Sequence, residues 1–535
     1  MRYFKANQFR LAILKSIAVL SCLLGVMAFP DFSREKEEFG FLDTITEAEV
    51  RDHIFYLGSD FLEGRSPGSE GYKRASSYMA SQLKAAGLVP IMNSAEGDRS
   101  YFQQVDFMIS TIAPESILHV KDGQKEIEWK FGEQFIPLLH GQEFKDGHYE
   151  GNAVFVGYGI EEPEYGWNDY QDRDVSGKIA IFYIGSPMKN DKPVLPEQKH
   201  ELYSSMMSSA QNRMMAAFSH KASGVIVIPD AQTSKMWSLL SAQMNRPSRR
   251  LKANAKKDKT HHIPIFLLHP EAAVELFEGT DFDPLTGKGK IESAQIKDLD
   301  VAFDLKYTVQ EEFICHNVVG FLPGSDPELK GEYIVAGAHL DHLGMEEGEP
   351  FNGANDNASG CAAVLEAAEA IAMSPHRRSI FIVFFTGEEG GGHGAFHFID
   401  DFPFSLENIE LAVNVDMVGR DSPQHPDTIL GIAPYNRRVQ LEEFMEQANE
   451  SIARVNLKTS IDGKYIEDHY GSSDEAMFHL RGIPAVLIIN GYPQPDYHMT
   501  SDDPDKIDYG RVVEASRLIY ALVATAANDE MLYLP

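Results

Sequence analysis

The chain has 535 residues, of which 43% are hydrophobic and 24% charged, so it exceeds one ordinary core and predicts two or three folded domains. Its 48 basic residues stand against 80 acidic ones, and the net charge of -32 argues against nucleic acid and anionic membrane surfaces as partners. The chain has three cysteines, and Cys22 lies in a segment that is predicted below to be cleaved off. The remaining Cys315 and Cys361 could form one disulfide at most, so a disulfide framework is excluded.

The N-terminus reads as a targeting segment. A basic stretch up to Lys15 precedes the apolar run Ile17–Phe29, which is too short to span a bilayer comfortably. Val26-Met27-Ala28 places small residues where a signal peptidase reads, so residues 1–28 are predicted to be a cleaved signal peptide. We expect an exported protein, periplasmic or extracellular, without a stable membrane span after cleavage. A signal-anchored form and a lipoprotein at Cys22 are the alternatives.

Residues 31–120 are expected to form the N-terminal part of the main domain. The polar turn Glu63–Gly71 precedes a stretch from Tyr72 to Gly87 whose apolar residues recur at helical spacing. Gly87 stands where a helix C-cap is expected. The pattern therefore predicts an amphipathic helix in this region.

Residues 140–295 look different, because short strand-like runs alternate with turn residues. The runs are Ala153–Gly157, Lys178–Ile184, Gly224–Ile228 and Pro264–Leu268. A helix is predicted over Met206–Ala222, and Lys252–Thr260 reads as a basic polar loop. This block is predicted to be an inserted α+β module.

Residues 305–535 alternate between strand and helix patterns, which predicts an α/β domain. The expected strands are Tyr333–Ala338, Ser379–Phe385, Leu411–Val415 and Ala485–Ile489, and the expected helix is Ala358–Met373. The continuous apolar run Ser379–Phe385 is typical of a strand that is buried on both faces.

Polar side chains with metal-binding chemistry follow each of these strands. The groups, in chain order, are His339 with Asp341, then Glu388 with Glu389, then Asp416, then Tyr497 with His498, and Asp356 lies in the turn 353–360 that opens the helix. The carboxyl ends of strands are where ligands bind in open α/β sheets. Imidazole mixed with carboxylate is zinc-type chemistry.

Each residue alone also has a plain structural explanation. His339 could be an ordinary satisfied polar residue, the Glu388-Glu389 pair could be solvated, and Asp356 could cap the helix. The joint pattern in one half of the chain favours a metal site.

The order of these motifs resembles the co-catalytic zinc aminopeptidases, the family that includes glutamate carboxypeptidase II and the transferrin receptor. The resembling segments are Ala338–Asp341, Gly353–Gly360, Gly387–Glu389, Asn414–Gly419 and Tyr497-His498, with Leu62–Arg65 as a lead-in. The middle block is similar to a protease-associated domain through Asp174–Ile179 and Lys221–Ile226.

The resemblance implies the zinc exopeptidase fold, a mixed central β-sheet flanked by helices with an inserted protease-associated domain, and two Zn²⁺ per chain. His339 and Asp416 are then ligands of one zinc, Glu389 and His498 of the other, and Asp356 bridges both. Glu388 becomes the general base and Tyr497 a donor to the oxyanion. These roles suit a two-metal hydrolase, which needs a bridging carboxylate, a free base and an oxyanion donor.

Supporting roles follow from position in the sequence. Asp341 and Asp502 are expected to orient the imidazoles of His339 and His498 from behind, and His342 to play a local part. The resemblance places a cis peptide at Asp356-Asn357.

One segment departs from the family. Glu475 stands where histidine usually follows the aspartate in the family, so the resemblance does not determine the residues of the substrate pocket. Asp474 is expected either to bind a substrate amine or to cap a helix.

The predicted function is that of a secreted two-zinc aminopeptidase, acting through metal-activated water on peptide or protein substrates with a free N-terminus. A carboxypeptidase, a dipeptidase or a glutaminyl cyclase on the same scaffold is the first alternative. Arg420 is the nearest cation for a substrate carboxylate. A non-catalytic, receptor-like binding protein is the second alternative.

Overall fold

The computed structural model describes residues 40–530 and 532, apart from 94–96, 123–124, 138–142, 145–146, 191, 245, 253–264, 290, 292–298, 435–437, 460–470 and 491–493. The predicted signal peptide, residues 1–28, and most of the predicted basic loop 252–260 lie outside the described residues. Within the described part, we find no helix that is both long and apolar enough to cross a membrane.

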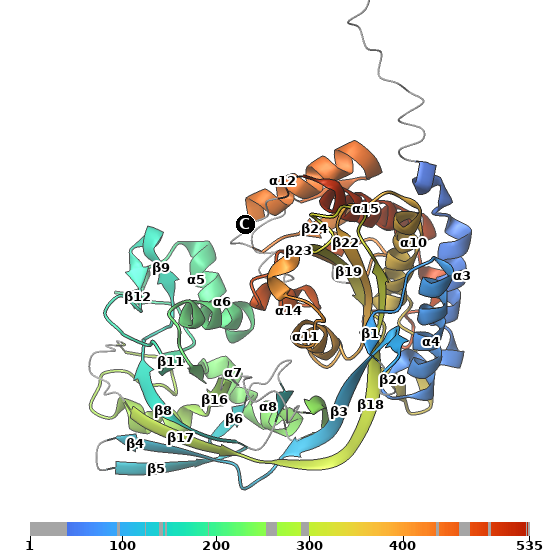
Figure 1. Ribbon diagram of the computed structural model, residues 1–535. Helices are drawn as coiled ribbons and strands as arrows, with labels where there is room; N and C mark the ends of the chain where they lie inside the picture. Colours follow the sequence, from blue (N-terminus) through green and yellow to red (C-terminus); the bar gives the residue numbers. More distant parts are fainter. Residues whose placement is uncertain are drawn as a thin grey trace, which may run out of the picture.

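The chain forms two bodies, each built on one large sheet (Figure 1). The main body carries a ten-stranded sheet, and the insert, residues 113–306, carries an eight-stranded one. The main sheet runs, in spatial order, β25 (Leu457–Lys458), β24 (Ile429–Ile432), β26 (Ala485–Ile489), β23 (Ile409–Val415), β19 (Tyr333–His339), β22 (Ser379–Phe385), β18 (Tyr307–Leu322), β3 (Phe102–Ile112), β15 (Ser248–Lys252) and β7 (Glu143–Phe144).

The main sheet is mixed, which confirms the predicted fold class. Its centre is parallel, since β19 pairs in parallel with β22 and β23, and β23 with β26. Its flanks are antiparallel, through β18 with β22 and with β3. The central strands are continuous apolar runs because both of their faces are covered by helices.

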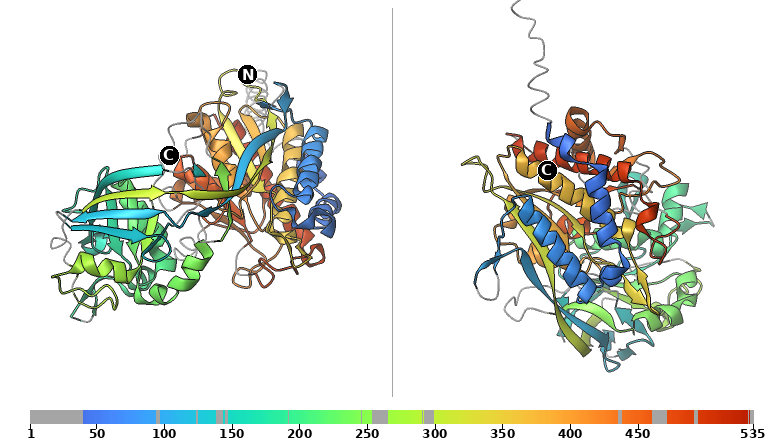
Figure 2. Two further views of the ribbon diagram at one scale, coloured as in Figure 1. Left: turned by 90° about the horizontal axis from the view of Figure 1, so that it is seen from below. Right: turned by 90° about the vertical axis from the view of Figure 1, so that its right-hand side faces the viewer.

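Helices cover both faces of the main sheet. One face is covered by α3 (Glu47–Leu57), α4 (Glu70–Ala85), α10 (Gly360–Met373) and α15 (Tyr509–Asn528), and the other by α11 (His393–Asp400) and α14 (Glu475–Leu480). Eleven of the fourteen residues of α10 are buried, because this alanine-rich helix lies between the sheet, α3 and α15. The side view shows α3 and α4 outermost (Figure 2).

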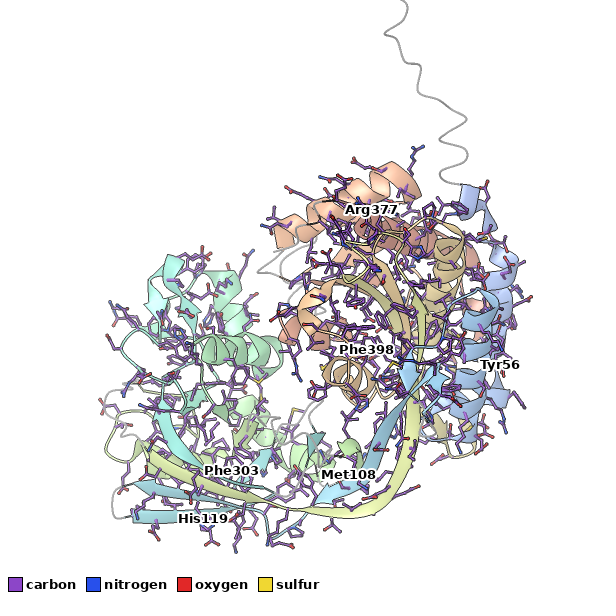
Figure 3. The ribbon with its side chains drawn as sticks, in the orientation of Figure 1. Tyr56, Met108, His119, Phe303, Arg377 and Phe398 are labelled. Carbon is purple, nitrogen blue, oxygen red and sulfur yellow. The ribbon has the colours of Figure 1, made fainter. Side chains whose placement is uncertain are left out.

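The insert is a separate layer with its own core. Its sheet runs β5 (Lys125–Lys130), β4 (Ile117–Asp122), β17 (Leu299–Leu305), β8 (Gly147–Phe155), β11 (Ile179–Tyr183), β14 (Gly224–Ile228), β16 (Ile265–Leu268) and β6 (Phe135–Pro137). Phe303 lies in this core and Phe398 in a core of the main body, and Met108 sits on β3 between them (Figure 3).

The two bodies are joined by a pair of long strands. β3 and β18 pair antiparallel from Phe102 to Ile112 and lead from the main body toward the insert (Figure 1). At the exit, the Ala113 amide donates to the Lys306 carbonyl at 2.8 Å. The two ends of the insert therefore meet at one point, and within it β7 and β15 also join the main sheet.

The insert's sheet is wider than the predicted block 140–295. The strands β4, β5, β6 and β17 belong to it, although they lie outside or at the margin of that block. Conversely, β7 and β15 fall within the block and pair with the main sheet. These memberships depend on pairing between distant segments, which local apolar patterns do not record.

Candidate metal centre

The predicted ligands meet at one edge of the main sheet. Because β19, β22, β23 and β26 are parallel, their carboxyl ends share that edge. His339 ends β19, Glu388 and Glu389 follow β22, Asp416 follows β23, and His498 follows β26. Asp356 reaches the same place from the turn before α10.

One cluster forms around His339. Its Nε2 lies 3.3 Å from Oδ1 of Asp356 and 3.3 Å from Oδ1 of Asp416. Oε2 of Glu388 is 3.9 Å from the same nitrogen. The ligand atoms of His339, Asp356 and Asp416 lie within 4.8 Å of one another, as a metal ion requires.

A second cluster forms around Glu389. Nε2 of His498 lies 3.1 Å from Oε2 of Glu389 and 3.2 Å from Oδ2 of Asp356. Nδ1 of His342 lies 2.6 Å from Oε1 of Glu389. His342, which sequence reasoning placed as a local residue, thus contacts a predicted ligand directly.

Asp356 faces both clusters, with Oδ1 toward His339 and Oδ2 toward His498. Its peptide bond to Asn357 is cis, at the position named from the sequence. Gly353 makes this turn possible, because it has a φ of 55° and a Cβ there would stand 2.2 Å from the Asp356 carbonyl oxygen.

The carboxylates of the two clusters favour positive charge between them. Burial disfavours a charged His339, yet Asp416, Glu388 and Asp356 raise its pKa well above the usual value. Burial likewise opposes charge on His498, but hydrogen bonds with Asp356 and Glu389 raise its pKa to about 10. Imidazole and carboxylate donors in this balance fit zinc, whose binding displaces such protons.

The carboxylates of the two residues expected to orient imidazoles accept backbone amides, although Asp341 also reaches its imidazole through its main-chain oxygen. Nδ1 of His339 contacts the main-chain oxygen of Asp341 at 3.1 Å, while the Asp341 carboxylate accepts the amide of Glu388 at 3.1 Å. The carboxylate of Asp502 accepts the amides of Asn355 and Asp356 at 3.0–3.1 Å. Asp502 therefore holds the turn that carries Asp356, and its action on the His498 imidazole stays a prediction.

Polar side chains of the turn also fix the strand end that carries Asp416. Asn357 donates to the Val415 carbonyl at 2.9 Å and accepts the Met417 amide at 3.2 Å. Ser359 accepts the Val418 amide and Asn355 the Gly419 amide, at 3.1 and 2.8 Å. The turn and the segment after β23 are thereby held as one unit.

Arg65 is a site residue whose role sequence reasoning missed. Its guanidinium is buried and donates to the carbonyls of Leu57, Leu340, Asn352 and Gly353 at 2.5–3.0 Å. It thus links the segment after His339 to the turn before Asp356. Its position in the Leu62–Arg65 segment was the only signal in the sequence. Its four acceptors could not be foreseen, because they are main-chain atoms that no residue type marks.

Glu388 and Tyr497 both lie at the centre. Burial raises the pKa of Glu388 well above its usual value, and the His339 charge opposes that rise. The Tyr497 ring stacks on the His498 ring at 3.8 Å between centroids, and burial raises the pKa of its phenol. The phenol therefore keeps its proton at neutral pH.

Asp474 and Glu475 form a buried acidic pair behind Asp416. Neither oxygen of Asp474 has a hydrogen-bond partner among the described residues, and burial raises its pKa well above the usual value. It precedes α14 without capping it through its side chain, so the capping alternative is wrong. Glu475 accepts from Asn414 and from the Gly471 amide, and burial raises its pKa to about 7.

The two cysteines do not form a bridge. Both are free and buried. The Cys361 thiol donates to the main-chain oxygen of His339 at 3.0 Å, and the Cys315 sulfur contacts the Thr386 hydroxyl at 3.1 Å.

The mixed sheet flanked by helices and the paired clusters at its edge agree with the arrangement that the resemblance implied. Residues 317–523 match the sequence profile of Peptidase family M28, which confirms the resemblance over that part of the chain. Aminopeptidase YwaD of Bacillus subtilis (strain 168) is 30% identical over 210 residues, 37% of this chain and 42% of that protein. A probable leucine aminopeptidase of Arthroderma benhamiae is 23% identical over 229 residues, 40% of this chain and 57% of that protein. The chain spans about half the length of these curated relatives.

Among solved structures, the aminopeptidase from Aneurinibacillus sp. strain AM-1 is 18% identical, covers 92% of this chain and 97% of that chain, and has a TM-score of 0.45. BSAP, a zinc aminopeptidase from Bacillus subtilis, is 20% identical, covers 91% of this chain and 96% of that chain, and has a TM-score of 0.45.

Proposed function

We propose that the protein is a two-zinc aminopeptidase that removes N-terminal residues from peptides. The observation that carries the proposal is Asp356, whose two oxygens each face a separate cluster with its own imidazole. The match to Peptidase family M28 and the aminopeptidase names of the relatives support the same reading.

His339, Asp416 and Oδ1 of Asp356 would hold one ion, and Glu389, His498 and Oδ2 of Asp356 the other. When bound, two zinc ions supply Lewis acidity that polarises the scissile carbonyl and acidifies water. His342 competes with a metal for Glu389, or orients that carboxylate, through its 2.6 Å contact.

Glu388 is the proposed general base. Its backbone amide is fixed by the Asp341 carboxylate, and its Oε2 lies 3.9 Å from Nε2 of His339, farther than the 3.3 Å of Asp356 and Asp416. Such a carboxylate can take a proton from the attacking water and pass it to the leaving amine.

Tyr497 and the acidic pair complete the proposal. The Tyr497 phenol keeps its proton, so it can donate a hydrogen bond to an oxygen that gains negative charge. Asp474 is buried beside Glu388 with two unpartnered oxygens, which would accept hydrogen bonds from a substrate ammonium, and the ammonium charge would lower its raised pKa.

The test combines metal content with a panel of paired substrates. We expect about two zincs per chain by elemental analysis and hydrolysis of free aminoacyl substrates but not of their N-acetylated forms. Equal hydrolysis of both forms would remove the requirement for a free amine. A well-folded sample without bound metal would favour the receptor-like alternative.

The carboxypeptidase alternative loses its nearest candidate, because Arg420 forms an ion pair with Asp496. Export is a separate proposal that rests on residues 1–28 alone. N-terminal sequencing of protein recovered outside the cytoplasm should begin at Phe29, and an intact Met1 would contradict cleavage.

A further inference from the structure

The insert contributes a charged strand to the main sheet. Residues 248–252 of β15 pair antiparallel with β3, with Arg249 opposite Ile109 and Leu251 opposite Phe107. Alternate residues of a strand share a face, so Arg249 points to the same side as Leu251. Leu251 belongs to the core of the main body together with Phe107.

That face is the side on which the metal-binding loops lie. The Phe107 ring packs on Gly387, where an added Cβ would stand 2.9 Å from the ring. Gly387 immediately precedes Glu388 and Glu389. Arg249 is therefore on the face of the sheet that supports the candidate base and ligand.

One contact fixes the Arg249 guanidinium beside the centre. Its Nη2 donates to Oγ of Ser66 at 2.7 Å. Ser66 packs against Gly344, because a Cβ added to Gly344 would stand 2.7 Å from the Cβ of Ser66. Gly344 is two residues after His342 in the chain. The Arg249 charge also acts on the Asp341 carboxyl. Burial raises the pKa of Asp341 to about 6, and the positive charge of Arg249 opposes that rise.

Arg249 keeps donors free, unlike the other arginines near the site. A guanidinium has five N–H donors, and Arg249 is half-buried with no ion pair among the described residues. The donors of Arg65 are taken by four carbonyls, and Arg420 is paired with Asp496.

Carboxyl groups predominate around the centre. Asp341, Glu388, Asp416 and Asp474 are carboxyl groups close to His339. A substrate ammonium is drawn to these groups, and a substrate carboxylate is drawn to a cation on another side. A planar guanidinium with free donors matches a carboxylate in a bidentate geometry.

We propose that Arg249 is a specificity-determining residue that binds a carboxylate on the leaving side of the scissile bond, so that short zwitterionic peptides are the preferred substrates. The proposal rests on the aminopeptidase function and deepens it. The carboxylate can be the C-terminus of a dipeptide or an acidic side chain at its second residue, and the two sources share one chemistry.

The experiment compares Arg249→Gln with the wild-type enzyme on three substrates with the same, fastest-cleaved N-terminal residue X. They are X-Gly, X-Gly-amide and X-Asp-amide, which carry a C-terminal carboxylate, none, and a side-chain carboxylate. For the variant we expect KM for X-Gly to rise about tenfold or more, with KM for X-Gly-amide changed less than about twofold. A rise for X-Asp-amide as well would mean that both sources of carboxylate are accepted.

Lys252→Gln is the matched control, because Lys252 lies on the opposite face of the same strand and pairs with Glu312 at 2.5 Å. It should leave all three KM values unchanged. Arg249→Lys keeps the charge without the planar fork and should recover part of the affinity for X-Gly. An equal KM rise for X-Gly and X-Gly-amide in Arg249→Gln would overturn the proposal, since Arg249 would then act on the fold alone.

A binding measurement separates this inference from the proposed function. Calorimetry on a Glu388→Gln background measures the Kd of the three peptides without turnover. If the wild-type enzyme hydrolyses none of the peptides but X-Gly binds in an Arg249-dependent manner, the aminopeptidase function fails and the Arg249 subsite stands. If X-Gly and X-Gly-amide bind equally well to the protein with Arg249 intact, the subsite is refuted.

Discussion

Replacing Arg65 by methionine should destabilise the main body by about 4 kcal/mol. The buried guanidinium donates to four main-chain carbonyls at 2.5–3.0 Å, and methionine fills similar space without any donor. A hydrogen bond contributes about 1 kcal/mol net, so four of them give the stated figure. The carbonyls of Asn352 and Gly353 precede the Asp356 turn, and zinc stoichiometry should therefore fall as well.

The tryptophans make a clean assay possible. All three, Trp129, Trp167 and Trp237, lie in the insert, so tryptophan emission follows the insert and far-UV circular dichroism follows the whole chain. In urea, Arg65→Met should lower the midpoint of the dichroism transition that reports unfolding of the main body, which tryptophan emission does not detect. The emission transition should stay in place.

Arg213→Met is the matched control in the insert. Arg213 is also buried, and it donates to the carbonyls of Tyr158, Gly185 and Tyr203 at 2.7–2.8 Å. This variant should move the emission transition and spare the zinc content. If Arg65→Met changed the unfolding free energy by less than about 1 kcal/mol, the four bonds could not contribute as reasoned.

Three further predictions concern single side chains. Glu388→Gln should keep both zincs by elemental analysis while kcat falls about 10²- to 10⁴-fold, and a nearly normal kcat would exclude it as the base. Asp356→Asn should weaken both metal sites at once, and an unchanged stoichiometry in a chelator titration would speak against bridging. Burial raises the pKa of Asp169 from 3.8 to about 6, so the folded state holds that proton more tightly than the unfolded state. The Asp169 contribution to the stability of the insert should therefore be fully present below about pH 4, fall as pH rises to about 6 and then level off. Asp169→Asn should flatten that profile in emission-monitored unfolding, whereas an unaltered slope would show that another group causes it.

Much of the central sheet could be predicted from the sequence. The bounds of β22 and β26 agree with the predicted strands, as do those of β14 in the sheet of the insert, because each is an uninterrupted apolar run in a buried position. The segment Ser248–Lys252 was not recognised, since its sequence SRRLK has no such run. It is a strand only because β3 offers it an edge, and that pairing joins residues about 140 positions apart.

The site could be predicted as a set of residues but not as a set of contacts. Strand ends placed His339, Glu389 and Asp416 correctly at one edge, because parallel strands align their carboxyl ends. The partners of Asp341, Asp502 and Arg65 are main-chain atoms, and no residue type announces them. Side-chain roles inferred from spacing alone are therefore least secure where a carboxylate can accept a backbone amide.

The point where the chain leaves and re-enters the main body, Ala113 and Lys306, has the geometry of a cassette junction. A short turn could join the two strands there, and the insert could be exchanged for another module without disturbing the order of the central strands. Such an exchange would also remove β15 and uncover one edge of β3, which invites pairing between molecules. A replacement module would therefore have to bring its own edge strand, or β3 would need charged residues at its open side, to prevent such pairing.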